Sequence, residues 1–267
     1  RYINKRFRFR GNIYKFIKKI IFTSVFIVLC SCSIMKQEVN YKDPQSYDFK
    51  KKVWEANEHE EAVIVAVHGY NDYSNSFQVP ATFLTKSRIS TISFDLRGFG
   101  MNEDNGSWFP LSVHINDVVF FVRHVRNNFP KKKIFLLGES MGGAIVISTL
   151  IKNKDLQIDG VILVAPAIWN FSKMNPIKKI FLNVLSTLAP NLKIDGGDFI
   201  KVTACNNIEI LKALSKDKYF IHKPNLKSLN GIVELMDESY EDTEKFLDQL
   251  AYSCLLYTSP SPRDLWI

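Results

Sequence analysis

The chain has 267 residues, of which 46% are hydrophobic, and this suits a globular protein with one large domain or a core that carries an insertion. Its formal net charge is +8, but residues 1–32 contain eight basic and no acidic residues, which leaves 27 basic and 27 acidic residues in the rest. The basic excess therefore belongs to the N-terminal segment and not to a binding face, so we expect no nucleic-acid partner.

Residues 1–32 have the pattern of a secretory signal peptide. A basic stretch precedes ten mostly apolar residues at 20–29, which are too few to span a bilayer. The Leu-Cys-Ser-Cys run at 29–32 resembles a bacterial lipobox, which would make Cys32 a lipidated N-terminus. We therefore expect a protein that is secreted across the inner membrane and anchored as a lipoprotein at its periplasmic face. A simple signal peptide or a poor signal anchor is the alternative, and because Arg1 is not Met we expect the native start to lie upstream.

Residues 33–52 are polar and are predicted to tether the membrane anchor to a folded core at residues 53–165. In this core, apolar runs of buried-strand type alternate with amphipathic helical patterns, which predicts an α/β fold with a mostly parallel sheet flanked by helices. The expected elements are a strand near Val53, a strand at 62–67, a helix at 77–86, a strand at 89–94, a helix at 113–129, a strand from 134, a helix at 144–151 and a strand at 160–165.

Polar or small residues follow the predicted strands at the points where they end. His68, Asp95, Ser140 and Ala165 each occupy such a position. Because ligands and catalytic groups in parallel sheets gather at the carboxyl ends of the strands, we expect these residues to lie along one edge of the sheet.

Residues 134–151 carry the motif on which the functional prediction depends. A short apolar strand leads into Gly138, Ser140 and Gly142, and a helical pattern follows. This is a G-x-S-x-G nucleophile elbow in its expected strand-turn-helix context. Small residues are needed because side chains at positions 138 and 142 would collide with neighbouring backbone, and the helix directs its N-terminal N–H groups toward a developing oxyanion. The alternative is a Gly-Ser turn that only joins a strand to a helix.

Residues 166–253 are predicted to form an inserted helical cap. A helix is expected at 175–188, and only short helical pieces around a Gly196-Gly197 joint are expected between 192 and 241. The apolar stripe of the first helix could cover the sheet or line an acyl-chain pocket, and we favour packing for most of it.

The last residues, 254–267, do not continue the helical periodicity and resemble the translation of a sequencing-library adaptor. We assign them to a non-native tail, and a genuine Ser-Pro tail is the alternative. If they are an assembly scar, the native protein continues, and the last strands and helices of the fold are missing from this chain. Apart from residues 30 and 32, the cysteines are Cys205 and Cys254, which gives no disulfide framework.

With these motifs placed, residues 53–253 resemble α/β-hydrolases of the monoacylglycerol lipase and lysophospholipase group. The resemblance rests on His68-Gly69 at a strand end, on the Asp-Leu-Arg-Gly-Phe-Gly run at 95–100 and on the Gly-Glu-Ser-Met-Gly-Gly run at 138–143. Softer matches in the cap are Ala165-Pro166, Asn207, Asp217 and residues 231–237. It implies a serine esterase or lipase that hydrolyses the ester of a monoacylglycerol or lysophospholipid.

The resemblance also implies roles for single residues. Ser140 would be the nucleophile that forms an acyl-enzyme, and the backbone N–H groups of Tyr70 and Met141 would form the oxyanion hole. His68 and Gly69 would support the oxyanion turn, as Gly138 and Gly142 support the elbow, and His68 would be structural rather than the catalytic base. The group implies no cofactor and no metal.

The chain departs from the group in one respect. The fold orders its triad as Ser, then Asp or Glu, then His, and nothing after Ser140 fits the last two roles. Asp95 precedes the serine and belongs to a structural turn with Arg97, and His222 is expected to be a surface or packing residue of the cap. We therefore expect the triad acid and base to be absent from this chain, and the chain alone to be inactive.

Two alternatives stay open at this point. The elbow indicates only acyl transfer, so the protein could be another serine hydrolase such as a peptidase or an acyltransferase. It could also be a non-catalytic lipoprotein that binds apolar ligands in a degenerate hydrolase pocket. The expected partners are a lipid or acyl-ester substrate and a membrane, the latter through Cys32.

Overall fold

The computed structural model describes residues 41–56, 59–194, 207–247 and 254–257. The chain divides into a unit Arg1–Lys42 and a unit Asp43–Ile267, and the fold described below is that of the second. The predicted signal peptide, the lipobox and Cys32 lie outside the described residues. Within the described residues, the helices are all too short or too polar to cross a membrane.

The centre of the fold is a mostly parallel sheet with the strand order β1-β3-β2-β4-β5-β6. Only the β1–β3 pair is antiparallel among these strands, and the pairs β3–β2, β2–β4, β4–β5 and β5–β6 are parallel. The carboxyl ends of β2 to β6 therefore meet at one edge. The strands are β1 (Lys51–Trp54), β2 (Ala62–Val67), β3 (Ile89–Phe94), β4 (Lys133–Glu139), β5 (Gly160–Val164) and β6 (Cys254–Tyr257).

Helices cover both faces of this sheet, because β2 is apolar at every position. Its Val63, Val65 and Val67 pack with residues of α3 and α4, whereas Ile64 and Ala66 pack on the other face with η2 and α2. An α/β fold with a mostly parallel sheet between helices is thereby confirmed. The helices of these layers are η2 (Ser74–Phe77), α2 (Gln78–Thr85), α3 (Leu111–Asn128) and α4 (Met141–Lys152).

The remaining described helices follow β5. They are α5 (Phe171–Met174), α6 (Pro176–Leu188), α7 (Ile208–Leu214) and α8 (Leu226–Leu247). Helix α6 shows alternating hydrophobic and hydrophilic bands, and its stripe is exposed, with Ile177 at 82% and Phe181 at 63%. The prediction that most of this stripe packs against the sheet is therefore wrong for α6.

The prediction of only short helical pieces between residues 192 and 241 is also wrong, because α8 is a single helix of 22 residues. Its buried face follows helical spacing but mixes apolar residues with small or polar ones: Leu226, Ser228, Gly231, Ile232, Leu235, Ser239 and Asp242. A search for apolar periodicity misses such a face. Helix α8 packs on α4, where Ser239 Oγ donates to Ala144 O at 3.3 Å and lies 3.2 Å from Ser148 Oγ.

The N-terminal part of the unit is attached to the core from Asp43 on, although residues 33–52 read as a tether. The 3-10 helix η1 (Pro44–Ser46) leads to two aromatic residues that flank the Arg97 guanidinium, at 4.3 Å from the Tyr47 ring centroid and 5.4 Å from that of Phe49. Phe49 also contacts Phe94 edge-on, with ring centroids 5.7 Å apart. Aromatic packing thus holds this segment on the domain.

Strand β6 lies within the segment that the sequence assigns to a non-native tail. Its four residues pair in parallel with β5, from Val161↔Cys254 to Val164↔Tyr257. A Cys-Leu-Leu-Tyr run suits a strand whatever its origin. The origin of residues 254–267 stays a prediction.

Candidate active site

The elbow lies where β4 passes into α4, at the carboxyl edge of the sheet. Ser140 has φ 51° and ψ −115°, a backbone conformation that residues other than glycine rarely adopt. It is held there by three backbone bonds: its N–H donates to Val164 O at 2.9 Å, and its carbonyl accepts from Ala167 N at 2.8 Å and Ala144 N at 3.2 Å. Such strain costs on the order of 1–3 kcal/mol and persists where the surroundings fix it. The half-buried Ser140 side chain is thus held at one defined place.

The two glycines of the motif lie against backbone, as their spacing predicts. A Cβ at Gly142 would stand 2.1 Å from Val67 O, and a Cβ at Gly138 would stand 2.5 Å from Gly142 O. Both distances are far below van der Waals contact. Glycine at these positions lets α4 start directly beneath the end of β2.

The second element of the site is the turn at residues 69–72, called the Gly69 turn below. It is closed by Asp72 N donating to Gly69 O at 3.3 Å, with Asn71 at φ 66°. The register Val67↔Gly138 brings it beside the elbow, and a Cβ on Gly69 would lie 3.4 Å from Ser140 Cβ. The Gly69 turn and the serine are therefore neighbours.

Two backbone donors of this region are unengaged. Within the described part of the chain, neither the Tyr70 N–H nor the Met141 N–H donates a hydrogen bond. Met141 is the first residue of α4, where N–H groups have no intrahelical acceptor and the helix dipole is positive. The arrangement offers hydrogen-bond donors and positive potential next to a fixed hydroxyl, which suits an anionic oxygen.

The Tyr70 side chain fixes the outer side of the Gly69 turn. Its hydroxyl lies 2.9 Å from Ser228 Oγ at the start of α8, and its ring meets Phe99 and Trp108 edge-on. Burial raises the pKa of this phenol, so Tyr70 stays neutral and is no proton acceptor.

His68 is fully buried and has both ring nitrogens engaged. Leu96 N–H donates to His68 Nε2 at 2.9 Å, so the proton lies on Nδ1, which donates to Gly69 O at 2.8 Å. Burial lowers the pKa of His68 to about 4. The side chain ties the ends of β2 and β3 together and has no free nitrogen for base catalysis.

The other histidines of the chain are also described, and none of them hydrogen-bonds the Ser140 hydroxyl. His114 is buried among the rings of Phe99 and Trp108, at centroid distances of 6.5 and 6.0 Å. His222 is exposed, as expected, with Nε2 2.9 Å from Asp217 O. The last two are His59, near the start of β2, and His124, which lies beside Asn128 on α3.

Asp95 is structural, as the sequence analysis expects. Its Oδ1 accepts from Ser74 N at 2.9 Å and its Oδ2 from Met101 N at 2.7 Å, and a Cβ on Gly100 would lie only 2.2 Å from Oδ2. Arg97 forms a buried bidentate pair with Asp117 of α3. No local sequence pattern marks this pair, because it joins a loop to a helix 20 residues later.

Glu139 is a residue to which the sequence analysis gave no role. Its carboxylate faces the Gly69 turn, with Oε2 3.3 Å from the position of a Cβ on Gly69. Burial and the nearby Asp72 raise its pKa, and the Gly69 amide opposes this rise. In the sequence, only its position between Gly138 and Ser140 indicates that it lies near the site.

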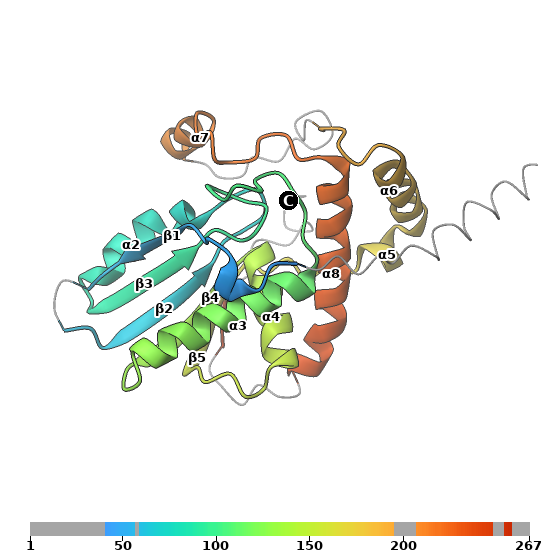
Figure 1. The fold of residues 1–267 in the computed structure, drawn as a ribbon. Helices are drawn as coiled ribbons and strands as arrows, with labels where there is room; N and C mark the ends of the chain where they lie inside the picture. Colours follow the sequence, from blue (N-terminus) through green and yellow to red (C-terminus); the bar gives the residue numbers. More distant parts are fainter. Residues whose placement is uncertain (1–40, 57–58, 195–206, 248–253, 258–267) are drawn as a thin grey trace, which may run out of the picture. The chain divides into compact units, whose positions relative to one another are not determined.

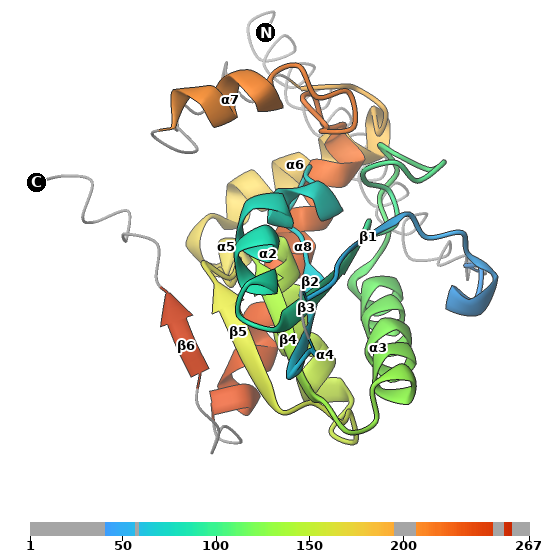
Figure 2. The same cartoon turned by 90° about the vertical axis from the view of Figure 1, so that its left-hand side faces the viewer.

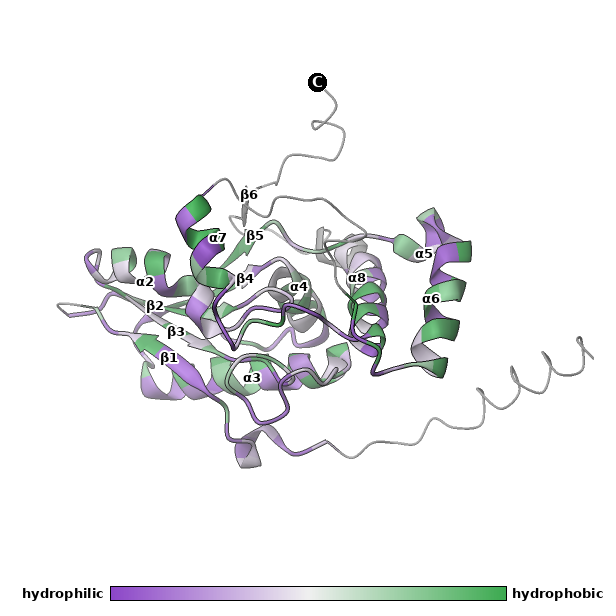
Figure 3. Ribbon diagram, turned by 90° about the horizontal axis from the view of Figure 1, so that it is seen from above, coloured by the Kyte–Doolittle hydropathy of each residue, from purple (hydrophilic) through white to green (hydrophobic). Residues whose placement is uncertain are grey.

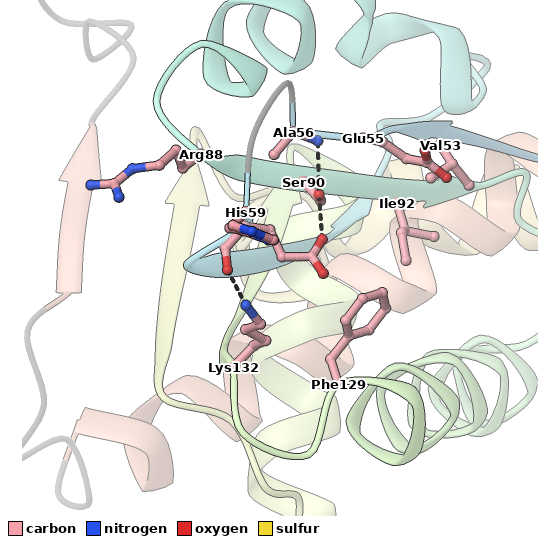
Figure 4. A pocket seen from close by; sticks show the side chains of 10 residues that line it. Val53, Glu55, Ala56, His59, Arg88, Ser90, Ile92, Phe129 and Lys132 are labelled. Atoms are coloured by element: carbon pink, nitrogen blue, oxygen red, sulfur yellow. Dashed lines mark hydrogen bonds between the residues drawn. The ribbon is translucent and has the colours of Figure 1, made fainter.

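A cavity of about 780 Å³ lies at the opposite edge of the sheet, where β2, β3 and β4 begin. Three of the residues that line it are joined by hydrogen bonds: Ser90 Oγ donates to Glu60 Oε2 at 2.7 Å, and Lys132 Nζ donates to Glu60 O. Figure 4 shows these hydrogen bonds as dashed lines. Because it lies at the edge where the parallel strands begin, this cavity is separate from the elbow. Among the described residues, no group of three or more His, Cys, Asp and Glu side chains could hold a metal ion.

The buried histidines predict acid lability. Burial lowers the pKa of His68 to about 4 and that of His114 to about 3, below the ordinary value of 6.5. Between pH 6.5 and 4 the unfolded chain binds protons that the folded chain excludes, so stability falls as the pH falls. Each histidine contributes a slope of up to about 1.4 kcal/mol per pH unit.

Urea unfolding at several pH values between 4.5 and 7.5 measures this slope. Removing one titrating group in His114→Leu should reduce the slope by up to about 1.4 kcal/mol per pH unit relative to the unchanged chain. An equal slope in both proteins would contradict neutral burial of His114.

The sequence is similar to that of lipid hydrolases. It is 27% identical over 188 residues to phospholipase YtpA of Bacillus subtilis, covering 70% of this chain and 71% of the relative. It is 28% identical over 147 residues to human monoglyceride lipase, covering 54% of this chain and 48% of the relative. The chain thus spans about half the length of the human protein.

Solved structures share the fold. The soluble variant of monoglyceride lipase from Saccharomyces cerevisiae superposes with a TM-score of 0.63 at 18% identity, covering 79% of this chain and 70% of that one. The Paleococcus ferrophilus monoacylglycerol lipase superposes with a TM-score of 0.60 at 19% identity, covering 74% of each chain. The family model described as serine aminopeptidase, S33, matches residues 58–258. The chain belongs to this family of hydrolases, and is an α/β-hydrolase of the monoacylglycerol lipase and lysophospholipase group.

Proposed function

We propose that this protein is a serine esterase that hydrolyses a monoacylglycerol or lysophospholipid through an acyl-enzyme on Ser140. The observation that carries the proposal is the strained Ser140 at the start of α4, next to unengaged N–H groups of Tyr70 and Met141. The names of its relatives, a phospholipase and monoglyceride lipases, favour a lipid ester as the substrate.

In the proposed reaction Ser140 Oγ attacks the ester carbonyl carbon while a base takes its proton. The carbonyl oxygen becomes an oxyanion that accepts hydrogen bonds from the Tyr70 and Met141 N–H groups. The glycerol or phosphoglycerol alcohol then leaves with a proton, and water hydrolyses the acyl-enzyme and releases the fatty acid.

We propose that the base and the acid of this reaction come from residues outside this chain's described part. In support, the two buried histidines lie in structural positions, and the other three, His59, His124 and His222, are exposed. The chain also spans only 48% of human monoglyceride lipase. A Ser140 without a base has its ordinary, weak nucleophilicity.

Turnover on a panel of substrates tests the proposed function. The full-length parent should release fatty acid from a monoacylglycerol or a lysophospholipid. Cleavage of aminoacyl anilides alone, or acyl transfer to an acceptor alcohol without hydrolysis, would replace esterase with one of the alternatives. No turnover in a parent that has an intact triad would contradict an enzymatic role.

The same assay on this chain alone should show no turnover of p-nitrophenyl butyrate above the Ser140→Ala background. Activity of the chain that disappears in Ser140→Ala would show that it holds its own base, and would overturn the proposed origin of the triad.

We further propose that Cys32 is lipidated and anchors the protein at the periplasmic face of a membrane. The lipobox-like run at residues 29–32 supports this. Mass spectrometry of the mature N-terminal peptide decides it, because an N-terminus that lacks an acylated Cys32 contradicts the anchor.

A further inference from the structure

The cap segment at residues 217–225, called the strap below, crosses the Gly69 turn on its way from α7 to α8. It bonds to the core at several separate points. Ile221 N donates to Asn71 O at 2.9 Å, and Tyr73 Oη donates to Asp217 Oδ2 at 2.6 Å. Asn105 Nδ2 donates to Tyr219 O at 3.3 Å, and Asn225 Nδ2 donates to Gly106 O at 2.9 Å. The strap is thus fixed to the Gly69 turn and to the loop after β3.

Asp217, the first residue of the strap, makes several of its contacts. Both of its carboxylate oxygens are engaged, because Oδ2 accepts from the Tyr73 hydroxyl and Oδ1 accepts from Tyr219 N at 2.9 Å. Its carbonyl oxygen lies 2.9 Å from His222 Nε2. The rings of Tyr73 and Tyr219 meet edge-on with centroids 5.9 Å apart. The carboxylate therefore sets the fold of the strap and its bond to the core at the same time.

The strap hydrogen-bonds to the backbone immediately after Tyr70. Asn71 is in the left-handed region at φ 66°, and its carbonyl oxygen accepts from the strap residue Ile221. Tyr73 is 6% exposed, and its hydroxyl reaches Asp217. One end of the Gly69 turn thus depends on the cap for its bonds.

From the sheet side, the turn is bounded by Glu139 and Asp95. Glu139 faces Gly69, and Asp95 Oδ1 accepts from Ser74 N beyond the turn. These contacts hold the two ends of the segment. Asn71, between them, has its carbonyl bonded to the strap.

We propose that Asp217 is a positioning residue, which through Tyr73 and the strap fixes the Gly69 turn and hence the Tyr70 amide beside Ser140. The oxyanion site is then complete only when the cap is docked on the core. The catalytic consequence rests on the proposed function, whereas the positioning itself does not.

Amide hydrogen exchange, followed by NMR on this chain, tests the positioning without any activity. In Asp217→Ala the Ile221 amide should exchange about 10-fold faster or more, because a charge-assisted hydrogen bond that supports its bond to Asn71 is lost. The Tyr70 and Asn71 amide resonances should shift. The Leu136 amide of β4 should keep its exchange rate, which excludes global unfolding as the cause.

Two further variants separate positioning from a general effect of the cap. Asp217→Asn can still accept from Tyr219 N with its oxygen and donate to the Tyr73 hydroxyl with its amide, so it should stay within about 3-fold of the unchanged chain. Glu209→Ala removes an exposed carboxylate from α7 of the same cap and should leave the Ile221 and Tyr70 amides unchanged. Unchanged Ile221 exchange in Asp217→Ala would overturn the proposal.

Kinetics of the full-length parent test the catalytic consequence. Asp217→Ala should lower kcat about 10-fold with KM within 2-fold, since a misplaced oxyanion donor weakens only the transition state. A raised KM with unchanged kcat would mean that the strap shapes only the substrate pocket, and would overturn this part. If the parent has no Ser140-dependent turnover, the proposed function fails, and the exchange measurements still decide the positioning.

Discussion

Replacing Ser140 with alanine in the full-length parent should lower kcat for its lipid ester by roughly 10⁴-fold or more. The reason is that the alanine methyl cannot form the acyl-enzyme, and the substitution leaves no hydroxyl at position 140. Initial rates of fatty-acid release measure the effect, and circular dichroism establishes that the variant is folded.

Ser148→Ala is the matched control, because Ser148 lies on α4, the helix that follows Ser140, and is buried. Within the described part of the chain its hydroxyl donates to Ser239 Oγ, which in turn donates to Ala144 O. This variant should keep its rate within about 2-fold, because it touches no reacting atom. Residual activity of Ser140→Ala above one hundredth of the parent's rate would contradict a Ser140 nucleophile.

Replacing Gly142 with alanine should destabilise the fold by about 3 kcal/mol or more, at or above the upper end of overpacking costs. The new Cβ would stand 2.1 Å from Val67 O and 2.7 Å from His68 O, so either α4 or the end of β2 must move. The better helix propensity of alanine returns only about 1 kcal/mol. Urea unfolding at pH 7 measures the difference.

Gly106→Ala separates this clash from conformational strain. A Cβ at Gly106 would meet nothing within 4 Å, but its φ is +90°. This variant should lose only about 1–2 kcal/mol, the cost of a left-handed alanine. Equal losses in both variants would mean that the close approach of α4 to β2 is not what requires glycine at position 142.

Much of the core could be predicted from the sequence, because its elements are marked by apolar runs with clear ends. The run at 62–67 is β2, residue for residue, and the strand at 89–94 is β3. The helix expected at 113–129 is α3, which begins two residues earlier, at Leu111. A strand without polar positions has to be buried on both faces, so its neighbours and its layer follow from its composition.

The contacts around the candidate site could not be predicted in this way. The Arg97–Asp117 pair, the bond between Tyr73 and Asp217, and the contact between Tyr70 and Ser228 join residues 20, 144 and 158 positions apart. No local pattern marks such pairs, because each partner taken alone resembles an ordinary polar residue. The face of α8 was missed for a related reason, since its Gly231 and Ser239 carry no hydrophobic signal.

The packing of α8 on α4 has a consequence for exchanging parts between related hydrolases. A cap removed at residues 166–253 would take α8 with it and expose the buried face of α4, where Ser148 and Thr149 are fully buried. The close fit also extends to Trp108, since a Cβ at Gly231 would lie 2.1 Å from its ring. The transplantable module is therefore the piece between β5 and the start of α8, and a chimera should keep α8 together with α4, on which it packs.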